Sequence, residues 1–377
     1  MRTFRTIRFL TGFLVIALCL TGCTGNDSVT DMQSSRSETS AGDSDNIDIG
    51  LCFDSFVIER WLRDRDVFTA TAQELGAKVN VQNANGDVDE QISEIRYLIG
   101  KKMDVIVIVT IDATKLSDVI REAKDKGIKV VCYDRLILDS GADLYVSFDN
   151  EKVGILMARY LKKELPDGGD IFEILGSKSD YNVSQVRKGF EEELKDSGLR
   201  IVYSTYCDNW LAELAFDAVN DGLDQNKDKV DGVMCGNDDL AGQAIKALTE
   251  KRLAGKVPVV GQDAELSACQ RIVEGTQTMS VYKSVDEEAR VAARLAVALG
   301  QGKDITDPDA EICVTDTISD GTYDVPCYSI EPVAVDKSNM KEVIIDGGFH
   351  LAEDIYMNVG ESESAGKGGA ETGEEQE

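Results

Sequence analysis

Short runs of apolar residues alternate with longer amphipathic runs from residue 47 to about residue 355. The short runs are rich in Val and Ile, which is typical of strands. They are apolar at successive positions, as expected for strands of sheets that are covered on both faces. Ten strands are expected, at Ile47–Cys52, Lys78–Val81, Val105–Val109, Lys129–Tyr133, Leu144–Phe148, Ile171–Leu175, Ile201–Thr205, Val230–Cys235, Val257–Val260 and Thr278–Tyr282.

The longer runs carry apolar residues at helical spacing. In the first of them, Trp61, Phe68, Ala72 and Leu75 fall on one face, and Gly76 is expected to end the helix. Helices in the second half of the chain are expected at Val183–Leu194, Leu211–Leu223 and Leu240–Glu250.

Strands that alternate with helices predict parallel sheets with right-handed crossovers and helices on both faces. The chain has 377 residues, of which 42% are hydrophobic and 29% charged, as in an ordinary globular protein. A globular part of roughly 310 residues exceeds the usual size of one core. The expected fold class is therefore α/β, with two Rossmann-like lobes and a cleft between them.

The N-terminus has the pattern of an export signal. Arg2, Arg5 and Arg8 precede the apolar run Phe9–Leu20, and the sequence Leu-Thr-Gly-Cys at 20–23 resembles a bacterial lipobox. Spanning a bilayer takes about 20 apolar residues, so this run is too short. Residues 1–22 are expected to be a lipoprotein signal peptide and Cys23 the lipidated first residue of the mature chain. The alternative is an ordinary signal peptide followed by an incidental cysteine.

Both ends of the globular part are flanked by polar, low-complexity sequence. Residues 23–46 are expected to form a lipidated flexible linker, and residues 356–377 a disordered acidic tail, because neither segment can bury much apolar surface. The protein is therefore expected outside the cytoplasm, anchored to the cell membrane through lipid on Cys23.

The net charge is −29, and loss of the three signal-peptide arginines would make it −32 (−29 − 3). Such a surface repels phosphate backbones, which argues against nucleic acid as a partner.

The cysteines predict neither a metal site nor a dense disulfide framework. Of nine, Cys19 and Cys23 precede the mature fold, and Cys52, Cys132 and Cys235 lie in strand-like runs where a buried free thiol behaves as a small apolar group. There is no CxxC pair, and the single histidine, His350, has no ligand neighbours at metal spacing, so no metal and no cofactor are expected. A further pair, Cys313 and Cys327, could form a disulfide.

Polar residues recur where the predicted strands end, and in open α/β sheets ligands bind beyond the carboxyl ends of the strands. Each residue also has a structural interpretation. Asp238 and Asp263 could be helix caps, Trp61 could be core, and Arg135 could form a surface ion pair. The recurrence in both halves favours a binding site, made of Glu59-Arg60-Trp61, Asp134-Arg135, Asp180, Asn182, Asp208, Trp210, Asn237-Asp238, Gln262-Asp263 and Lys283.

These residue types suit an uncharged, polyhydroxylated ligand. Hydroxyl groups both donate and accept, so carboxylate, amide and guanidinium groups can each engage them. The apolar C–H faces of a pyranose pack on flat rings, the role expected of Trp61 and Trp210. Acidic and basic members balance, which argues against a phosphate or dicarboxylate ligand.

The chain resembles the bacterial periplasmic sugar-binding proteins of the ribose/galactose class, type I, and most closely the D-xylose-binding components of ABC importers. The resemblance covers about Ile47 to Leu351. It is carried by ERWLRDRDVF (59–68), GAKVNVQNANG (76–86), YDRLI (133–137), VSFDNEKVG (146–154), GNDDLAGQAIKAL (236–248) and GQDAELSACQRIVEGTQTMSVYK (261–283). It implies sugar contacts at Arg60, Trp61, Asp134, Arg135, Asp180, Asn182, Trp210, Asn237, Asp263 and Lys283.

The resemblance implies two lobes that close over the sugar, joined by three crossovers near Phe148–Asn150, Ser284 and Asp316–Thr322. The N-terminal lobe is then 47–149 with 285–316, and the C-terminal lobe 150–284 with 317–355. The family's Asp-Asn-Asn-Ala-Lys run is here Asp180-Tyr181-Asn182-Val183-Ser184, which affects the expected edge of the pocket.

The implied function is capture of a monosaccharide, with D-xylose expected, and its delivery to a membrane permease and ATPase complex by a monomeric binding protein without catalysis. Presentation of the sugar to a chemoreceptor or sensor kinase, or the binding of a different pentose or hexose, is the alternative.

Other classes of function fit less well. Asp224–Asp228 imitates the start of a calcium loop, but Lys229 and Cys235 stand where that loop needs Gly and Glu. The turn after the first strand, 53–56, lacks the GxGxxG of a nicotinamide-binding enzyme. The lone His350 leaves no Ser-His-Asp or Cys-His set, and interleaved basic residues disfavour a glycosidase carboxylate pair.

Overall fold

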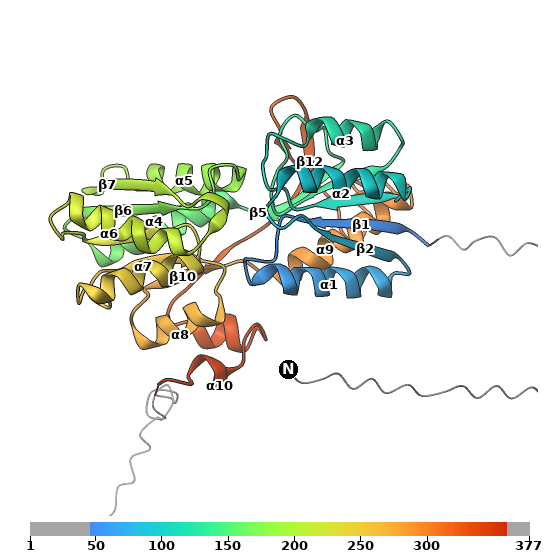
Figure 1. Ribbon diagram of the computed structural model, residues 1–377. Coiled ribbons are helices and arrows are strands. Elements are labelled where there is room, and N and C mark those ends of the chain that lie inside the picture. Colours follow the sequence, from blue (N-terminus) through green and yellow to red (C-terminus); the bar gives the residue numbers. More distant parts are fainter. Residues whose placement is uncertain (1–45, 360–377) are drawn as a thin grey trace, which may run out of the picture. The chain divides into compact units, whose positions relative to one another are not determined.

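The computed structural model describes residues 46–359 (Figure 1). The predicted signal peptide, the predicted lipidation site Cys23, nearly all of the predicted linker and most of the predicted tail lie outside the described residues. Within 46–359, no helix has both the length and the apolar character needed to cross a bilayer.

One sheet organises the part of the molecule called lobe 1 here. Its strand order is β11-β12-β5-β4-β3-β1-β2, and all neighbours are parallel except β11 and β12. The strands are β1 (Asp48–Phe53), β2 (Lys78–Asn83), β3 (Val105–Ile108), β4 (Lys129–Tyr133), β5 (Leu144–Phe148), β11 (Asp316–Ser319) and β12 (Asp324–Ile330).

Helices cover both faces of the lobe 1 sheet, and the apolar strands explain why. Alternate residues of a strand point to opposite faces. Leu51 and Val107 pack in the cluster that includes α1 and α9, whereas Ile106 and Ile108 pack in the cluster that includes α2 and α3 (Figure 1). The helices are α1 (Arg60–Glu74), α2 (Val88–Gly100), α3 (Ser117–Lys124) and α9 (Val285–Gly300).

A second sheet organises lobe 2, in the order β13-β10-β9-β8-β6-β7, and only β10 and β13 are antiparallel. Its helices pack mainly in two pairs, α4 with α5 and α6 with α7. The elements are α4 (Asn150–Glu164), β6 (Gly169–Leu175), α5 (Tyr181–Glu193), β7 (Leu199–Tyr206), η1 (Asp208–Trp210), α6 (Glu213–Gln225), β8 (Gly232–Cys235), α7 (Asp238–Glu250), β9 (Val259–Gln262), α8 (Leu266–Glu274), β10 (Met279–Tyr282), β13 (Val333–Val335), η2 (Lys341–Ile345) and α10 (Ala352–Ile355).

The ten expected strands are all present, with ends shifted by at most two residues. Trp61, Phe68 and Ala72 are buried as expected, and Gly76 follows the helix in the left-handed conformation, with φ +83°. Leu75 was expected on the same buried face but is 42% exposed, because it lies beyond the last helical turn. The sequence pattern did not predict β11, β12 or β13.

The chain passes between the two sheets three times. Two passages lie between β5 and α4 and between β10 and α9, next to the positions expected at Phe148–Asn150 and Ser284. The third was expected at Asp316–Thr322, which is wrong. Those residues belong to the β11–β12 hairpin on the edge of the lobe 1 sheet, and the passage follows at 331–332, so lobe 1 includes residues up to Ile330.

Two further expectations can be compared with the structure. The seven cysteines within 46–359 are free thiols, so Cys313 and Cys327 are not paired. The acidic tail was expected from residue 356, but Tyr356 and Val359 pack against the apolar cluster around α8 and Phe349. The ordered chain therefore continues at least to Val359.

Candidate functional site

A cavity lies between the two lobes, at the carboxyl ends of their strands. It has about 470 Å³ of space not filled by protein atoms, including its mouth. All ten residues proposed from the sequence line it: Arg60, Trp61, Asp134, Arg135, Asp180, Asn182, Trp210, Asn237, Asp263 and Lys283. Its lining also includes Ile58, Leu175, Gly176, Val183, Val186, Met234, Gly236 and Gln262.

Arg60 begins α1 and is held by carboxylates on three sides. Its Nε and Nη2 each donate to Asp64 at 3.2 Å, Nη1 donates to Asp134 Oδ2 at 2.9 Å, and Nη2 also donates to Glu288 Oε2 at 2.6 Å. Asp64 and Glu288 have no solvent exposure and do not line the cavity. The orientation of the Arg60 guanidinium is therefore fixed by groups behind the cavity wall.

Arg135 bridges the lobes. Its Nη1 donates to Asp54 Oδ2 at 2.7 Å and to the Thr110 carbonyl at 3.1 Å, both in lobe 1. Its Nε lies 2.8 Å from Asp180 Oδ2 of lobe 2 as an ion pair, although the angle does not suit a hydrogen bond. The surface ion pair considered from the sequence is thus a buried one, since Arg135 is only 3% exposed.

Asp134 and Asn182 form a second link between the lobes. Asn182 Nδ2 donates to the backbone carbonyl of Asp134 at 2.9 Å and to its Oδ1 at 3.1 Å, and Tyr145 Oη donates to Asn182 Oδ1 at 3.2 Å. Asp180 caps α5 by accepting from the Asn182 backbone N–H at 2.9 Å. The start of α5 is therefore locked against the end of β4.

Asp134 and Asp263 occupy corresponding places after β4 and β9. Both have left-handed backbones, with φ +59° and +95°, and each donates its N–H to the next strand at 2.8 Å, to Val146 and Val281 respectively. Lys283 Nζ lies 3.6 Å from Asp134 Oδ2 and 3.4 Å from Asp263 Oδ1. Strained conformations of this kind cluster at functional sites, where the surrounding structure fixes them.

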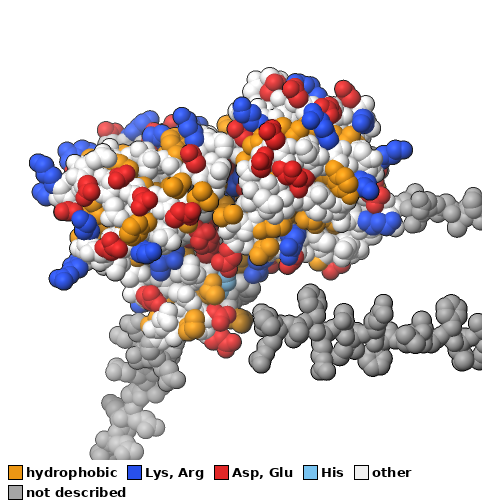
Figure 2. Space-filling model, viewed as in Figure 1, with side chains coloured by type: hydrophobic (Ala, Val, Ile, Leu, Met, Phe, Trp, Pro, Cys, Tyr) orange, Lys and Arg blue, Asp and Glu red, His pale blue; other side chains and the backbone are white. Residues whose placement is uncertain are grey.

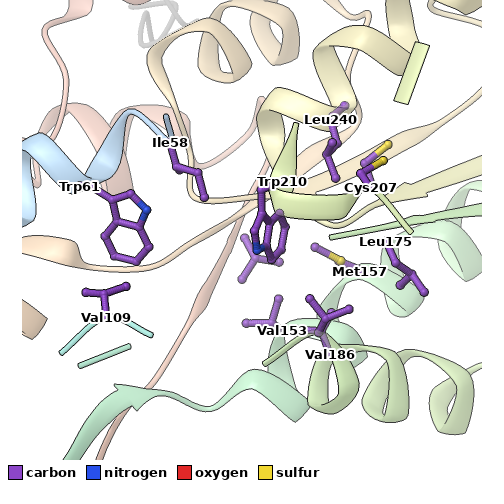
Figure 3. Packing of buried hydrophobic residues seen from close by; sticks show 14 of the residues in the cluster. Ile58, Trp61, Val109, Val153, Met157, Leu175, Val186, Cys207, Trp210 and Leu240 are labelled. Carbon is purple, nitrogen blue, oxygen red and sulfur yellow. The ribbon is translucent and has the colours of Figure 1, made fainter. Parts of the chain in front are cut away.

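Two tryptophans stand on opposite sides of the cavity, Trp61 in lobe 1 and Trp210 in lobe 2. Figure 3 shows Trp61 beside Val109 and Trp210 among the apolar side chains of lobe 2. The Trp210 ring lies directly on Gly176, where an added Cβ would come within 2.1 Å of the ring. Trp210 Nε1 donates to Asp180 Oδ2 at 3.2 Å, which fixes the plane of the ring. Trp61 is part of both the core and the cavity wall, so the structural interpretation is confirmed and a ligand contact stays a prediction.

Five buried polar atoms of the lining have no hydrogen-bond partner among the described residues. Three are donors and two are acceptors. Unpaired buried polar groups are rare in proteins and costly, so a set concentrated in one cavity indicates a site for a ligand that both donates and accepts. The atoms are Trp61 Nε1, Arg135 Nε, Asn237 Nδ2, Gln262 Oε1 and Asp263 Oδ1.

The charged lining residues balance, with three basic side chains and three acidic ones. Burial alone would raise the pKa of Asp134, but Arg60, Lys283 and Arg135 outweigh it and lower the pKa to about 2. Burial raises the pKa of Asp180, opposed by Arg135. The cavity therefore suits an uncharged ligand. On the visible outer face, acidic and basic side chains are likewise interspersed (Figure 2).

The helix-cap interpretations of Asp238 and Asp263 are wrong. Asn237, not Asp238, caps α7, because its Oδ1 accepts from the Leu240 N–H at 3.0 Å. Asp238 is buried behind the wall, where it accepts from Ser280 Oγ at 2.6 Å, and burial raises its pKa to about 7. Glu265 is the N-cap residue of α8 and makes no side-chain cap bond, so Asp263 has no capping role.

Some residues at strand ends do not reach the cavity. Glu59 and Asp208 do not line it, although the sequence grouped them with their neighbours. Of the residues that depart from the family pattern, Tyr181 and Ser184 line a separate hollow, whereas Val183, which stands where the family has Ala, lines the cavity. Among residues 46–359, no group of His, Cys, Asp and Glu is arranged to hold a metal ion.

The sequence singled out Gln262 but did not select it as a ligand contact, and it missed the supports Asp54, Asp64 and Glu288. Gln262 Nε2 donates to the Gly236 carbonyl at 2.5 Å, which leaves Oε1 as the unpaired atom. Its position at the end of β9, next to Asp263, was the available signal.

The chain is similar to known proteins over most of its length. A model of the periplasmic binding protein domain matches residues 49–304. The D-xylose-binding periplasmic proteins of Haemophilus influenzae and Escherichia coli are 44% and 42% identical, over 84% and 82% of this chain and 95% and 92% of theirs. An ABC transporter solute-binding protein from Clostridium phytofermentans, solved with β-D-glucose, has a TM-score of 0.72 at 28% identity, covering 82% of this chain and 99% of that one. The chain belongs to the periplasmic binding protein family.

Proposed function

We propose that this protein captures an uncharged monosaccharide, D-xylose, between its lobes and delivers it to an ABC permease without chemical change. The observation that carries the proposal is the set of five buried polar atoms that have no hydrogen-bond partner and lie in one cavity of balanced charge. A pyranose supplies hydroxyl groups that can accept from Trp61 and Asn237 and donate to Gln262 and Asp263.

The walls suit the rest of such a ligand. Trp61 and Trp210 offer flat apolar surfaces on opposite sides, on which the C–H faces of a sugar ring can pack. Ile58, Val183 and Met234 add apolar lining without hydrogen-bonding groups. The choice of D-xylose among pyranoses rests on the names of the two relatives above 40% identity.

Lobe closure is the proposed means of capture. Lining residues come from both lobes, so a bound sugar would contact both and stabilise the closed arrangement. The three passages of chain between the sheets are the proposed hinge. The permease would then recognise the closed form, as a transport role requires.

Export and anchoring are part of the proposal. The lipobox at 20–23 supports lipidation of Cys23 and a place on the outer side of the cytoplasmic membrane. In cells that process lipoproteins, the Cys23→Ser variant should move from the membrane fraction to the soluble fraction. Retention of this variant in the membrane fraction would contradict anchoring through Cys23.

Calorimetric titration with a panel of aldopentoses and aldohexoses tests the binding function. D-xylose is expected to bind most tightly, and Asp263→Ala and Trp210→Ala should each weaken binding by at least about 2 kcal/mol, because buried partners lose their contacts. Thr276→Ala, away from the cavity, serves as the control. If no aldose binds, the proposed function is wrong; if sugars bind but these variants match the parent, the site is misplaced.

A further inference from the structure

The carboxylate of Glu288 lies behind the cavity wall, next to Arg60. Glu288 is in the first turns of α9, has no solvent exposure and is not part of the cavity lining. Its Oε2 accepts from Arg60 Nη2 at 2.6 Å, while its Oε1 has no hydrogen-bond partner among the described residues. Glu288 therefore meets the cavity only through Arg60.

The contacts of Arg60 show what Glu288 contributes. A guanidinium has five N–H groups. Four of them are directed at carboxylates: one on Nε and one on Nη2 at Asp64, one on Nη2 at Glu288, and one on Nη1 at Asp134. The fifth belongs to Nη1, which lies 3.9 Å from Asp263 Oδ1 of lobe 2. Glu288 thus accepts the second Nη2 hydrogen of Arg60. Without Glu288 this hydrogen would be free to turn the guanidinium towards another acceptor, including a ligand.

The position of Glu288 in the chain adds a link to the hinge. Lys283, which lines the cavity, ends the passage from β10, and α9 starts two residues later. The backbone N–H of Glu288 donates to the Ser284 carbonyl at 3.0 Å, so the turn that holds Glu288 also forms the end of that passage. Glu288 therefore lies one helical turn from the proposed hinge.

We propose that Glu288 is a positioning residue, which orients the Arg60 guanidinium so that one Nη1 hydrogen faces the sugar. The inference rests on the proposed sugar-binding function. It adds a residue that makes no contact with the sugar and that lies 228 residues along the chain from the residue it orients.

Ionisable groups from several elements surround Glu288. The titratable and charged groups that face it are Arg60 and Asp64 on α1, Tyr133 and Asp134 at the end of β4, and Lys283. Burial raises its pKa, and Asp134 and Asp64 raise it further, against Arg60 and Lys283. A glutamine is a close copy of a neutral glutamic acid and keeps the oxygen that accepts from Arg60. Glu288→Gln is therefore the conservative variant.

The test compares Glu288→Gln, Glu288→Asp and Glu288→Ala with Glu287→Ala, which removes the exposed neighbouring carboxylate. D-xylose affinity should stay within about threefold for the Gln and Glu287→Ala variants, because both leave the acceptor in place. It should fall at least about tenfold for Ala, which removes the acceptor, and for Asp, which withdraws it by one methylene group. The Asp variant keeps the carboxylate, so its loss would report position and not charge. Equal affinity in all four variants, or a loss in Gln as large as in Ala, would overturn the proposal.

A second readout does not depend on sugar. In NMR spectra of arginine-labelled protein, the side-chain N–H signals of Arg60, assigned by comparison with Arg60→Lys, should show hindered rotation in the parent, the Gln variant and Glu287→Ala. They should show faster rotation or exchange in Glu288→Ala. If the parent binds no sugar but this pattern appears, the proposed function fails while the positioning of Arg60 by Glu288 stands. If the Arg60 signals are the same in Glu288→Ala as in the parent, the positioning role is wrong whatever the ligand.

Discussion

The two lobes share one plan of strands and helices, yet their polar groups in the cavity differ. In lobe 1, four of the five N–H groups of Arg60 are directed at carboxylates, two of which lie outside the cavity, and both carboxylate oxygens of Asp134 accept hydrogen bonds. In lobe 2, Asn237, Gln262 and Asp263 each hold one buried polar atom without a hydrogen-bond partner, and the lobe 1 lining holds two such atoms, on Trp61 and Arg135. Lobe 1 therefore contributes mainly charged groups whose geometry is set in advance, and lobe 2 contributes most of the hydrogen-bonding groups that a ligand completes.

Because of this difference, substitutions in the two lobes should affect the stability of the fold and the affinity for the sugar to different extents. Removing a saturated charge in lobe 1 leaves other buried charges without partners, so the fold itself should weaken. Removing an atom of lobe 2 that has neither a hydrogen-bond nor an ion-pair partner takes nothing from the unliganded protein, so only binding should weaken. Substitutions in the two lobes test this distinction.

Arg60→Ala should have the largest effect. It leaves Asp64 and Glu288, both without solvent exposure, next to Asp134 with no guanidinium, so the free energy of unfolding should fall by about 3–5 kcal/mol and sugar binding should be lost. Urea denaturation followed by tryptophan fluorescence measures the first effect, and calorimetry the second. Arg65→Ala removes a partly exposed ion pair from the same helix and should change stability by less than about 1 kcal/mol. Equal effects of the two substitutions on stability and on sugar binding would show that the contacts of Arg60 contribute no more than an exposed ion pair does.

Two buried aspartates should give opposite pH dependence in the two lobes. In lobe 1, Asp320 accepts from the backbone N–H groups of Ser140, Gly141, Thr322 and Tyr323, and these bonds outweigh burial and lower its pKa to about 2. Its stabilisation is present above the unfolded pKa of about 3.9 and is lost as pH falls towards 2. In lobe 2, burial raises the pKa of Asp238 to about 7. Its contribution to the free energy of unfolding is therefore present below about pH 4 and is lost as pH rises from about 4 to 7.

Asn substitutions at both positions test these signs. Asp320→Asn should lower the free energy of unfolding by about 2 kcal/mol at neutral pH, with the difference shrinking below about pH 4. Asp238→Asn should become more stable relative to the parent as pH rises from about 4 to 7. Urea denaturation from pH 3 to 8 follows both. The same slope for the two variants would show that the environments of these aspartates do not differ as described.

The sequence predicted the ten strands that have apolar runs, and the strand ends supplied the candidates from which the resemblance selected the ten proposed site residues. Parallel strands bring their carboxyl ends to one edge, so polar residues just after the strands lie near one another there. It did not predict Asp64 or Glu288, because their relation to Arg60 arises from the packing of α9 on α1 and leaves no local pattern. It missed β11 because Asp316–Ser319 is largely exposed and lacks an apolar run, and this led to the wrong third passage.

Asn237→Ser should affect binding alone. Serine is about as good a helix cap as asparagine, so α7 keeps its cap while Nδ2, the unpaired donor, is removed. Sugar affinity should fall about tenfold to thirtyfold, and the free energy of unfolding should change by less than about 1 kcal/mol. Calorimetry and urea denaturation of the same preparation give both values. A loss of stability as large as the loss of binding free energy would contradict the assignment of Asn237 to ligand contact.

Ser179→Ala should have the smallest effect and concerns the place where the lobes meet. Ser179 lies in lobe 2 outside the cavity lining, and its Oγ donates to the Ile111 carbonyl of lobe 1 at 3.0 Å. A second bond, from the Ala113 N–H to the Ser179 carbonyl at 3.0 Å, is retained in the variant. Loss of one hydrogen bond that exists only between closed lobes should lower sugar affinity about threefold to fivefold.

The pattern of that loss is more informative than its size. Because Ser179 acts on the closed arrangement and not on the sugar, every sugar of the panel should weaken by the same factor. Ser184→Ala, which removes an exposed hydroxyl from the neighbouring helix, should leave all affinities unchanged. A loss confined to one epimer would mean that Ser179 contacts the ligand. Ser179 would then have to be counted among the residues that line the cavity. A uniform loss would show that direct contacts between the lobes, and not only contacts through the sugar, set the affinity.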